Sequence, residues 1–308
     1  MNVIYVVIVT HNPKIWVDKC LGSLRQSLCT VRTIVIDNNS SDDSGEYIKK
    51  NYLEVDYIQF EENLGFGAAN NIGIKKAYEA NADYVFLLNQ DAWIEPNTIE
   101  NLIRAHENEP QFGILSPMHL NGRGDALDYN FSIYINPSKC KKIYSDIYLK
   151  SLKSKLYEVE FVNAAAWLLT RECIETVGGF NPSFFHYGED ENYVQRTKYK
   201  KLRVGVLATC KIFHDRETRT GTNIYFKDEL ELFKRLLILK VSNPFSDYNF
   251  NDEFKKQFKL IIKTILFLRF DMAKKNISKV FLLNRKNKKE IIENKKKSII
   301  EKSAFLNI

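Results

Sequence analysis

One acidic residue stands at the end of an unusually apolar run. The run from Val85 to Leu88 is apolar throughout and leads directly into Asn89, Gln90 and Asp91. Such a run is typical of a strand buried on both faces, as in a parallel sheet. Ligands of these sheets collect outside the carboxyl ends of the strands, and oxygen-rich side chains there suit a hard divalent cation. The pattern indicates a Mg²⁺ or Mn²⁺ site at Asp91, with an Asx turn as the alternative.

A group of three acids is the second candidate for chemistry. Glu189, Asp190 and Glu191 follow one another at the start of an expected helix. A carboxylate beside an attacking hydroxyl group can take its proton as a general base. The alternative is structural, because acids in the first turn of a helix interact favourably with its dipole. A strand expected at residues 209–213 leads to His214, a metal ligand or a buried histidine of the core.

These residues stand on a pattern of alternating strands and helices. Strands are expected at residues 3–9, 33–36, 55–60 and 84–88, with helical patterns between them. This alternation predicts an α/β fold with a parallel, doubly wound sheet. The carboxyl ends of its strands meet at one edge, where a nucleotide site would be assembled. The candidates for binding the nucleotide follow these ends: Thr10, Asn12, Asp37, Asn39, Asn63, Gly65, Gly67, Asn70, Asn89 and Gln90.

The glycine pair does not indicate a dinucleotide-binding fingerprint. That motif requires a third glycine, where this chain has Asn70, and it follows the first strand, whereas Gly65 and Gly67 follow the third. Residues 118–157 show little periodicity, and we expect them to form a variable excursion over the site. Order returns later, with further strands expected at residues 203–207 and 209–213.

Composition and charge divide the chain in two. Hydrophobic residues make up 44% and charged residues 27%, as in a soluble globular protein. The net charge of +7 belongs to the tail, because residues 250–308 hold 16 Lys and Arg against 6 Asp and Glu. We therefore predict a first domain over residues 1–245 and a basic helical extension over residues 246–308. No nucleic-acid partner is expected.

The cysteines and the N-terminus indicate the cytoplasm. The five cysteines include no CxxC pair, so neither a disulfide framework nor a zinc site is expected. The apolar residues 3–9 follow no basic segment, and we interpret them as a strand and not as a signal peptide.

The tail contains a basic amphipathic pattern. Its apolar residues recur at helical spacing, with lysines between them: Phe254, Phe258, Ile261, Ile262, Ile265, Leu266 and Leu268, with Lys255, Lys256, Lys259 and Lys263. An anionic membrane surface attracts a helix of this kind. The alternative is a helix packed on the first domain with its lysines in solvent. Both interpretations stay open from the sequence.

Six short motifs occur in order along the first 220 residues. They are Val9–Asn12, Ile36–Ser40, Asn63–Gly67, Leu88–Asp91, Gly178–Phe180 and Tyr187–Asp190. Together they resemble the inverting family 2 glycosyltransferases of GT-A fold, most closely the rhamnosyltransferase-like members that build bacterial surface polysaccharides. The resemblance implies a Rossmann-like, mostly parallel central sheet. It also implies sugar transfer from a UDP- or dTDP-linked donor to a saccharide or lipid-linked saccharide, at the inner face of the plasma membrane.

The resemblance also implies a role for several side chains. Asp37 would pair with the N3–H of a uracil or thymine base, and Asn63 with the glycine turn after it would lie near the ribose and diphosphate. Asp91 would hold the metal, Asp190 would be the catalytic base, and His214 would be a second metal ligand. The metal motif departs from the family pattern, because Asp91 is its only acid.

Two other functions fit the same fold class. A sugar-nucleotide pyrophosphorylase usually carries a glycine-rich, basic loop directly after its first strand, and the segment 10–14 lacks one. A catalytically inactive binding protein of GT-A fold is the second alternative, and donor hydrolysis in the presence of Mn²⁺ distinguishes it from an enzyme.

Overall fold

A computed structural model describes residues 2–152, 156–217, 228–283 and 288–308. The first half contains β1 (Ile4–Thr10), α1 (Val17–Arg25), β2 (Arg32–Asp37), α2 (Ser44–Asn51), β3 (Asp56–Gln59), α3 (Phe66–Glu79), β4 (Tyr84–Leu88), β5 (Ala92–Ile94), α4 (Thr98–Asn108), β6 (Phe112–Asn121), α5 (Tyr129–Tyr134) and α6 (Ile143–Tyr148). The second half contains β7 (Leu156–Glu158), β8 (Ala166–Thr170), α7 (Arg171–Val177), α8 (Glu189–Tyr199), β9 (Arg203–His214), α10 (Glu229–Ser242), α11 (Phe250–Leu266), α12 (Phe270–Leu283) and α13 (Lys288–Ile300).

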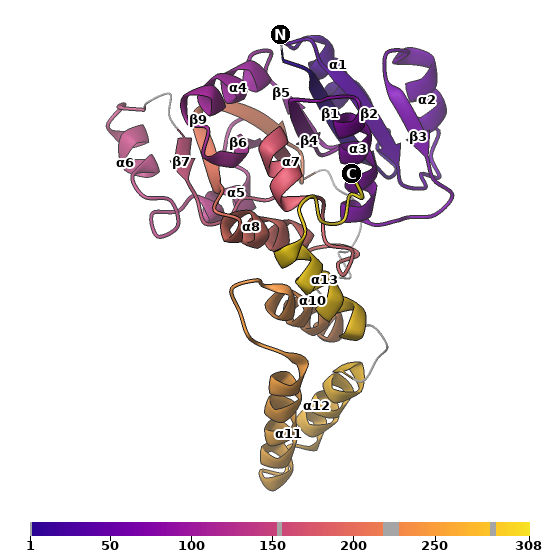
Figure 1. The fold of residues 1–308 in the computed structure, drawn as a ribbon, viewed down its shortest axis with the longest axis vertical. Coiled ribbons are helices and arrows are strands. Elements are labelled where there is room, and N and C mark those ends of the chain that lie inside the picture. The colour runs from indigo at the N-terminus through magenta and orange to yellow at the C-terminus, as the bar shows by residue number, and fades with distance from the viewer. Residues whose placement is uncertain (1, 153–155, 218–227, 284–287) are drawn as a thin grey trace.

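The described strands form one sheet of order β3-β2-β1-β4-β8-β6-β9-β5, with β7 paired to β9. Strands β1 to β4 are parallel to one another, as the alternation of strands and helices predicts. The figure shows the helices packed around this sheet (Figure 1). The carboxyl ends of β1 and β2 lie in register, with Thr10 opposite Asp37, so the first two polar motifs are neighbours in space.

The second half of the sheet departs from a purely parallel pattern. Strand β8 runs antiparallel to both β4 and β6, and β5 runs antiparallel to β9. The two short strands predicted at residues 203–207 and 209–213 are one strand, β9. Its pairing with β6 jumps from Leu207 to Lys211, and this irregularity explains why the sequence suggested a break. The predicted excursion after residue 118 begins later, because β6 continues to Asn121.

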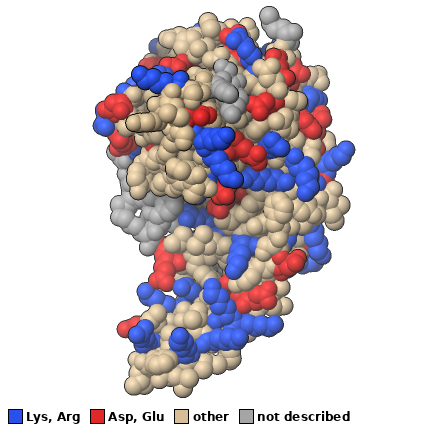
Figure 2. All heavy atoms as spheres, turned by 90° about the vertical axis from the view of Figure 1, so that its left-hand side faces the viewer, with Lys and Arg blue, Asp and Glu red and all other residues tan. Residues whose placement is uncertain are grey.

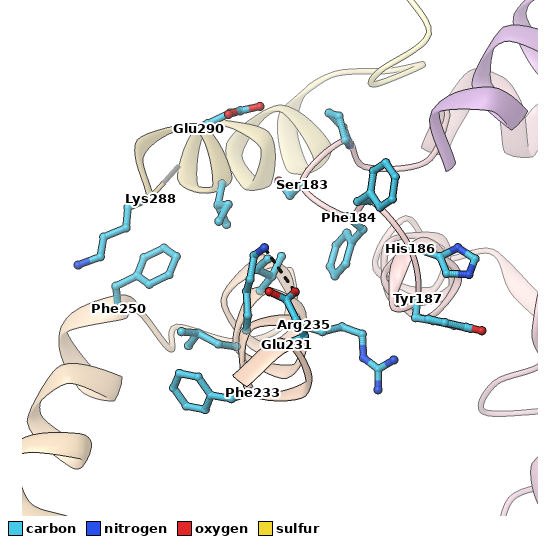
Figure 3. Close-up of a pocket in the computed structure, with 16 residues that line it drawn as sticks. Ser183, Phe184, His186, Tyr187, Glu231, Phe233, Arg235, Phe250, Lys288 and Glu290 are labelled. Atoms are coloured by element: carbon cyan, nitrogen blue, oxygen red, sulfur yellow. Dashed lines mark ion pairs between the residues drawn. The ribbon is translucent and has the colours of Figure 1, made fainter. Parts of the chain in front are cut away.

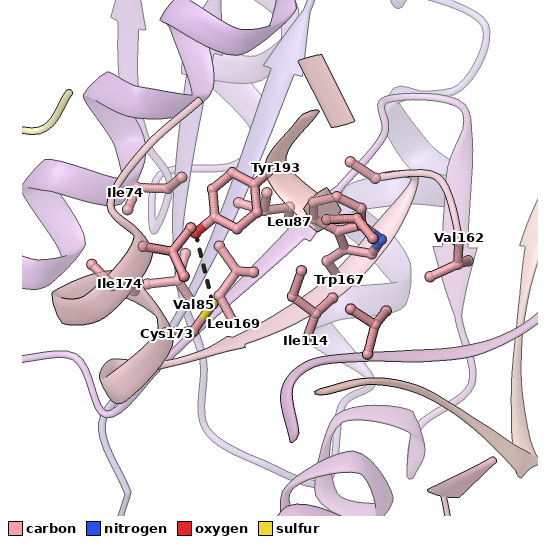
Figure 4. Packing of buried hydrophobic residues seen from close by; sticks show 14 of the residues in the cluster. Ile74, Val85, Leu87, Ile114, Val162, Trp167, Leu169, Cys173, Ile174 and Tyr193 are labelled. Atoms are coloured by element: carbon pink, nitrogen blue, oxygen red, sulfur yellow. Dashed lines mark hydrogen bonds between the residues drawn. The ribbon is translucent and has the colours of Figure 1, made fainter. Parts of the chain in front are cut away.

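Two apolar clusters cover the two faces of the sheet. In the cluster drawn in Figure 4, Val85 and Leu87 of β4 pack with Trp167 of β8 and with Tyr193 of α8. The apolar run of β4 is buried at every position because its residues alternate between the two clusters. The sequence therefore identified correctly a strand that is covered on both sides.

The C-terminal helices form a separate projection. Helices α11 and α12 make a hairpin that extends away from the sheet, while α10 and α13 lie between the hairpin and the sheet domain (Figure 1). The chain then returns to the main domain, where Gly179 N donates to Ala304 O at 2.8 Å and Leu306 joins the core. The predicted boundary at residue 246 stays a prediction, although α10 and α13 pack against each other across it.

Candidate functional site

Asp91 and His214 meet at the edge of the sheet where the strands end. Their side chains are buried, and Asp91 Oδ1 lies 3.4 Å from His214 Nε2. The register explains the meeting, because β9 lies between β5 and β6 and places His214 opposite both Ala92 and Asn121. The pairing of β5 with β9 thus brings the carboxylate of Asp91 next to the imidazole of His214, although the two residues are far apart in the sequence.

Two further residues, which sequence analysis did not select, extend this pair. Asp128 lies with its Oδ2 3.5 Å from His214 Nδ1 and forms an ion pair of 2.8 Å with Arg216 Nε. Asp128 Oδ1 also accepts a hydrogen bond from Phe131 N and caps α5. The one sequence signal for Asp128 was its position as a helix cap. It lies within the stretch that appeared irregular, so its contact with His214 could not be foreseen.

Asp190 approaches the same cluster from α8. Burial raises the pKa of its carboxyl group, whereas the backbone N–H groups of Glu191 and Ala164 and the charge of Arg216 oppose this shift. Glu191 N donates to Asp190 Oδ1 at 2.8 Å. The charge of Arg216 thus acts on Asp190, and Arg216 itself forms an ion pair with Asp128 beside the Asp91–His214 pair.

The neighbouring acids face other surroundings. Glu189 is buried, and this burial, together with the charge of Asp190, raises its pKa to about 8. A side chain at Gly67 would pack against its Cβ, so Glu189 lies beneath the glycine turn. Burial and Asp190 also raise the pKa of Glu191, which Arg235 and Lys139 lower. Arg216, which lies beside the Asp91–His214 pair, is among the groups that shift the pKa of Asp190. The main groups that shift the pKa values of Glu189 and Glu191 do not include it.

Helix α8 is anchored firmly behind these acids. Tyr193 Oη donates to Gly178 O at 2.7 Å, and the buried Arg196 donates to the carbonyl oxygens of Val177 and Gly179. Because these bonds join α8 to the turn after α7, they determine where the first turn of α8 lies. The Gly178–Gly179 motif, which sequence analysis interpreted as the end of a helix, indeed follows α7.

Asp37 lies at the other end of the strand edge and is completely buried. Its Oδ1 accepts hydrogen bonds from the hydroxyl groups of Thr10, at 2.9 Å, and Ser40, and its Oδ2 accepts one from Ser40 N at 3.1 Å. The structure thus joins Thr10 and Asp37, as predicted, in a network that also shapes the loop after β2.

Several other predicted donor-binding residues hold the loops to one another. Asn12 Oδ1 accepts from the backbone N–H of Ser41 at 2.7 Å, and Asn12 itself has a φ of 52°. Gln90 exchanges two hydrogen bonds with the backbone of His11, at 2.7 and 3.1 Å. Asn39 lies in the same loop region with a φ of 67°. These side chains organise the edge at which a nucleotide would bind.

The glycine turn has a packing requirement. Gly65 has a φ of 83°, and a Cβ there would lie 2.2 Å from Phe185 O. Asn63 Oδ1 accepts from Gly65 N at 2.9 Å and from Asn38 Nδ2 at 2.8 Å, which links this turn to the loop after β2. Asn70 is buried and donates to Phe66 O within α3. The turn at Gly65 therefore packs closely against Phe185, in the loop that leads to Asp190.

The Asp91–His214 pair fits a divalent cation. A carboxylate oxygen and an imidazole nitrogen 3.4 Å apart can both bind one ion, and Asp128 beside His214 Nδ1 would orient the imidazole. Asn89 Nδ2 lies 3.5 Å from His214 Nε2. Within the described residues no group of three or more His, Cys, Asp or Glu side chains is arranged to hold a metal. With two protein ligands, waters and substrate phosphates would complete the coordination of such an ion.

The chain belongs to glycosyltransferase family 2. The family model described as "Glycosyl transferase family 2" matches residues 5–177, which is more than half of the chain. The family and the GT-A fold predicted from the sequence are thereby confirmed. Neither the pyrophosphorylase nor the inactive binding protein receives support from the comparisons.

Characterised relatives include sugar transferases. The chain is 32% identical to dTDP-rhamnosyl transferase RfbF of Shigella flexneri, over 68% of each chain. It is 24% identical to an N-acetylglucosaminyl-diphospho-decaprenol L-rhamnosyltransferase of Mycobacterium tuberculosis, over 71% of this chain and 78% of the relative. It is 25% identical to the low-salt glycan biosynthesis hexosyltransferase Agl10 of Haloferax volcanii, over 59% of this chain, and spans only 58% of that relative.

Solved structures share the fold at low identity. Residues 1–349 of S. aureus TarS in complex with UDP superpose with a TM-score of 0.57 and 15% identity, over 81% of this chain and 67% of that one. The mannosyltransferase PcManGT from Pyrobaculum calidifontis, in complex with GDP-Man and Mn²⁺, gives a TM-score of 0.56 and 14% identity, over 75% of this chain and 62% of that one.

Proposed function

We propose that this protein is an inverting glycosyltransferase that transfers a hexosyl or rhamnosyl group from a UDP- or dTDP-linked donor. The acceptor is a saccharide or lipid-linked saccharide used in cell-surface polysaccharide synthesis. The observation that carries the proposal is the buried Asp91–His214 pair with Asp128 and Arg216 beside it, near enough to Asp190 for the charge of Arg216 to lower the pKa of that carboxyl group. The relatives named as rhamnosyl- and hexosyltransferases support it.

Each group in this arrangement has a chemical task. Asp190 takes the proton of the attacking acceptor hydroxyl, and attack from the face opposite the leaving group inverts the anomeric centre. Asp91 and His214 would hold a Mg²⁺ or Mn²⁺ ion, which would offset the charge that develops on the departing diphosphate. Arg216, which forms an ion pair with Asp128, favours the charged, basic form of Asp190, although burial outweighs this effect and raises the pKa of Asp190.

The preference of the protein for one nucleobase over another tests the proposed identity of the sugar donor. Beside its bonds from Thr10 and Ser40, the carboxylate of Asp37 would accept a hydrogen bond from the N3–H of uracil or thymine, whereas the equivalent ring nitrogen of adenine or cytosine carries no hydrogen to donate. We expect UDP and dTDP to raise the melting temperature more than ADP and CDP do, because ligands stabilise the state they bind. The Asp37→Ala variant should lose this preference.

The control is Ser40→Ala, which removes one hydroxyl bond to Asp37 but keeps the carboxylate. It should retain the order of the four nucleotides. Equal stabilisation of the wild type by all four would leave Asp37 as a loop-forming residue with no part in recognising the base.

We further propose that the α11–α12 hairpin contacts the inner face of the plasma membrane. The distribution of polar and apolar side chains in this hairpin is the reverse of that in a soluble helical hairpin. Its helices bury polar side chains, namely Glu253, Gln257, Thr264 and Asn276, and expose large apolar ones, namely Phe254, Phe258, Ile262, Ile265, Leu266, Phe270, Met272, Ile277 and Phe281. Figure 2 shows Lys and Arg side chains, with some Asp and Glu, on the lower part of the molecule above a tip of uncharged side chains. Apolar surface with adjacent basic charge is the combination that binds anionic lipid.

None of the helices in the described ranges has the length and apolar character needed to cross a membrane.

Vesicle sedimentation tests the hairpin contact. The wild type should sediment with vesicles of phosphatidylglycerol and less with vesicles of phosphatidylcholine. The double variant Phe258→Glu/Ile262→Glu places two charges on side chains that are 54% and 46% exposed, so it should fold normally and remain in the supernatant. Leu53→Glu is the matched control, because Leu53 is 84% exposed on the sheet domain. If the double variant sediments as fully as the control, the hairpin is not the contact.

A further inference from the structure

A cavity of about 510 Å³ lies beside the loop that leads to Asp190, the proposed catalytic base. It is enclosed by the loop 182–187, by α10, by the start of α11 and by α13 (Figure 3). All of its lining residues lie outside residues 5–177, the part of the chain that the family model matches. Its size is in the range of pockets that hold small ligands.

The walls of this cavity are apolar in about half of their area, and polar or charged side chains form the rest. Phe184 comes from the loop, Phe233 and Ile238 from α10, Phe250 from α11 and Ile291 from α13. Phe184, Ile238, Phe250 and Ile291 are buried members of one cluster, and Phe233 packs against it partly exposed. This apolar part of the lining suits a hydrocarbon chain.

A cation lies at the end of the cavity nearest the acids of α8. The Arg235 guanidinium lies 5.6 Å from the ring centre of Tyr187, and a Cβ at Gly188 would contact its Cγ at 3.4 Å. Two acids also line the cavity, Glu231 and Glu290, and Glu231 forms an ion pair of 3.6 Å with Lys234. Arg235 of α10 therefore places a positive charge beside Gly188, the residue directly before α8.

The opposite end of the cavity leads to the hairpin. Phe250 is the first residue of α11, and the exposed apolar residues of that helix begin at Phe254. Lys288 lies 5.6 Å from the Phe250 ring centre. The cavity thus connects the loop before the catalytic base with the apolar surface of the projection.

We propose that this cavity binds the prenyl-phosphate portion of a lipid-linked acceptor. The phosphate group lies against Arg235, and the apolar chain extends along Phe233 and Phe250 toward the hairpin. The sugar on the phosphate would then lie at Asp190. This inference rests on the proposed glycosyltransferase function and names the class of acceptor.

Farnesyl diphosphate is the probe, with farnesol and inorganic diphosphate as its two halves. In calorimetric titrations of the full chain without added metal, we expect farnesyl diphosphate to bind at least ~tenfold more tightly than either half, since both the charge and the chain contribute. UDP at saturating concentration should not displace it. Displacement by UDP would place the probe in the donor site and overturn the proposal.

Two variants separate the head of the probe from its chain. Arg235→Ala should weaken farnesyl diphosphate ~tenfold while leaving farnesol unchanged, and Phe233→Ser should weaken both. Arg104→Ala, an exposed arginine on α4, is the control and should bind as the wild type does. Unchanged binding in Arg235→Ala and Phe233→Ser overturns the cavity as the site.

The same proteins are titrated with UDP. If the cavity variants bind UDP normally and lose only farnesyl diphosphate, the cavity proposal is supported. If the wild type binds no UDP or dTDP and transfers no sugar, the proposed function fails, whatever the cavity binds.

Discussion

Replacement of Asp190 by asparagine is expected to reduce sugar transfer by ~10²–10⁴-fold, the usual contribution of a general base. The substitution keeps the size of the side chain and its place at the start of α8, but the amide cannot accept the proton of the acceptor hydroxyl. Donor binding should stay nearly unchanged, because the loss concerns the transition state. Transfer assays and UDP titrations on the same protein measure the two effects separately.

The adjacent acid provides the matched control for this prediction. Glu191→Gln alters a neighbouring carboxyl group whose pKa responds to Arg235 and Lys139 and not to Arg216, so it should keep most of its activity. Transfer by Asp190→Asn within tenfold of the wild type would rule out Asp190 as the base and direct attention to Glu189 or Glu191.

The raised pKa of Asp190 also predicts the pH dependence of the reaction. A general base works only when it is deprotonated, so the transfer rate should fall as the pH decreases through the pKa of Asp190. Since burial raises this pKa above the ordinary value of 3.8, the fall should begin at a higher pH than for an exposed aspartate. A rate profile measured at saturating donor and acceptor reports this pKa in the bound enzyme.

Replacement of Asp91 by asparagine is expected to abolish the effect of Mn²⁺ on UDP binding. Asp91 is the one acid of its motif, and its Oδ1 faces His214 Nε2 across 3.4 Å. The amide is nearly isosteric but neutral, and a divalent cation held by only two side chains depends strongly on that charge. In the wild type, Mn²⁺ should tighten UDP binding at least ~tenfold, as measured by titration with and without the ion.

A surface carboxylate of the same sheet is the control for Asp91. Asp56 pairs with Lys76 at a largely exposed position, and Asp56→Asn should leave the effect of Mn²⁺ intact. Melting temperatures of both variants exclude a folding defect. Full transfer by the wild type in excess chelator would contradict a metal-dependent reaction altogether.

The first half of the fold could be predicted because its information is local. The apolar run that ends at Leu88 and the alternation of strands and helices before it predict a parallel sheet, and β1 to β4 form one. The carboxyl ends of parallel strands share an edge, so the meeting of Thr10 with Asp37 also follows from the order of the elements. Residue types and spacing were sufficient here.

The later part of the site could not be predicted in the same way. Asp128 follows β6 at the beginning of a stretch without clear periodicity, and Arg216 lies two residues beyond His214. Their contact depends on β9 lying between β5 and β6, and sequence patterns do not specify the order of strands in a mixed sheet. The antiparallel direction of β8 was missed for the same reason.

The sequence by itself determined the family, the parallel half of the sheet, the candidates Asp91, Asp190 and His214, and the separate basic tail. Only the tertiary structure decided that the charge of Arg216 acts on Asp190 and which apolar residues of the tail remain exposed. The physical reason is that a motif specifies the chemistry of a side chain, whereas its environment depends on long-range packing. Burial, neighbouring charge and solvent exposure arise only when distant segments come together.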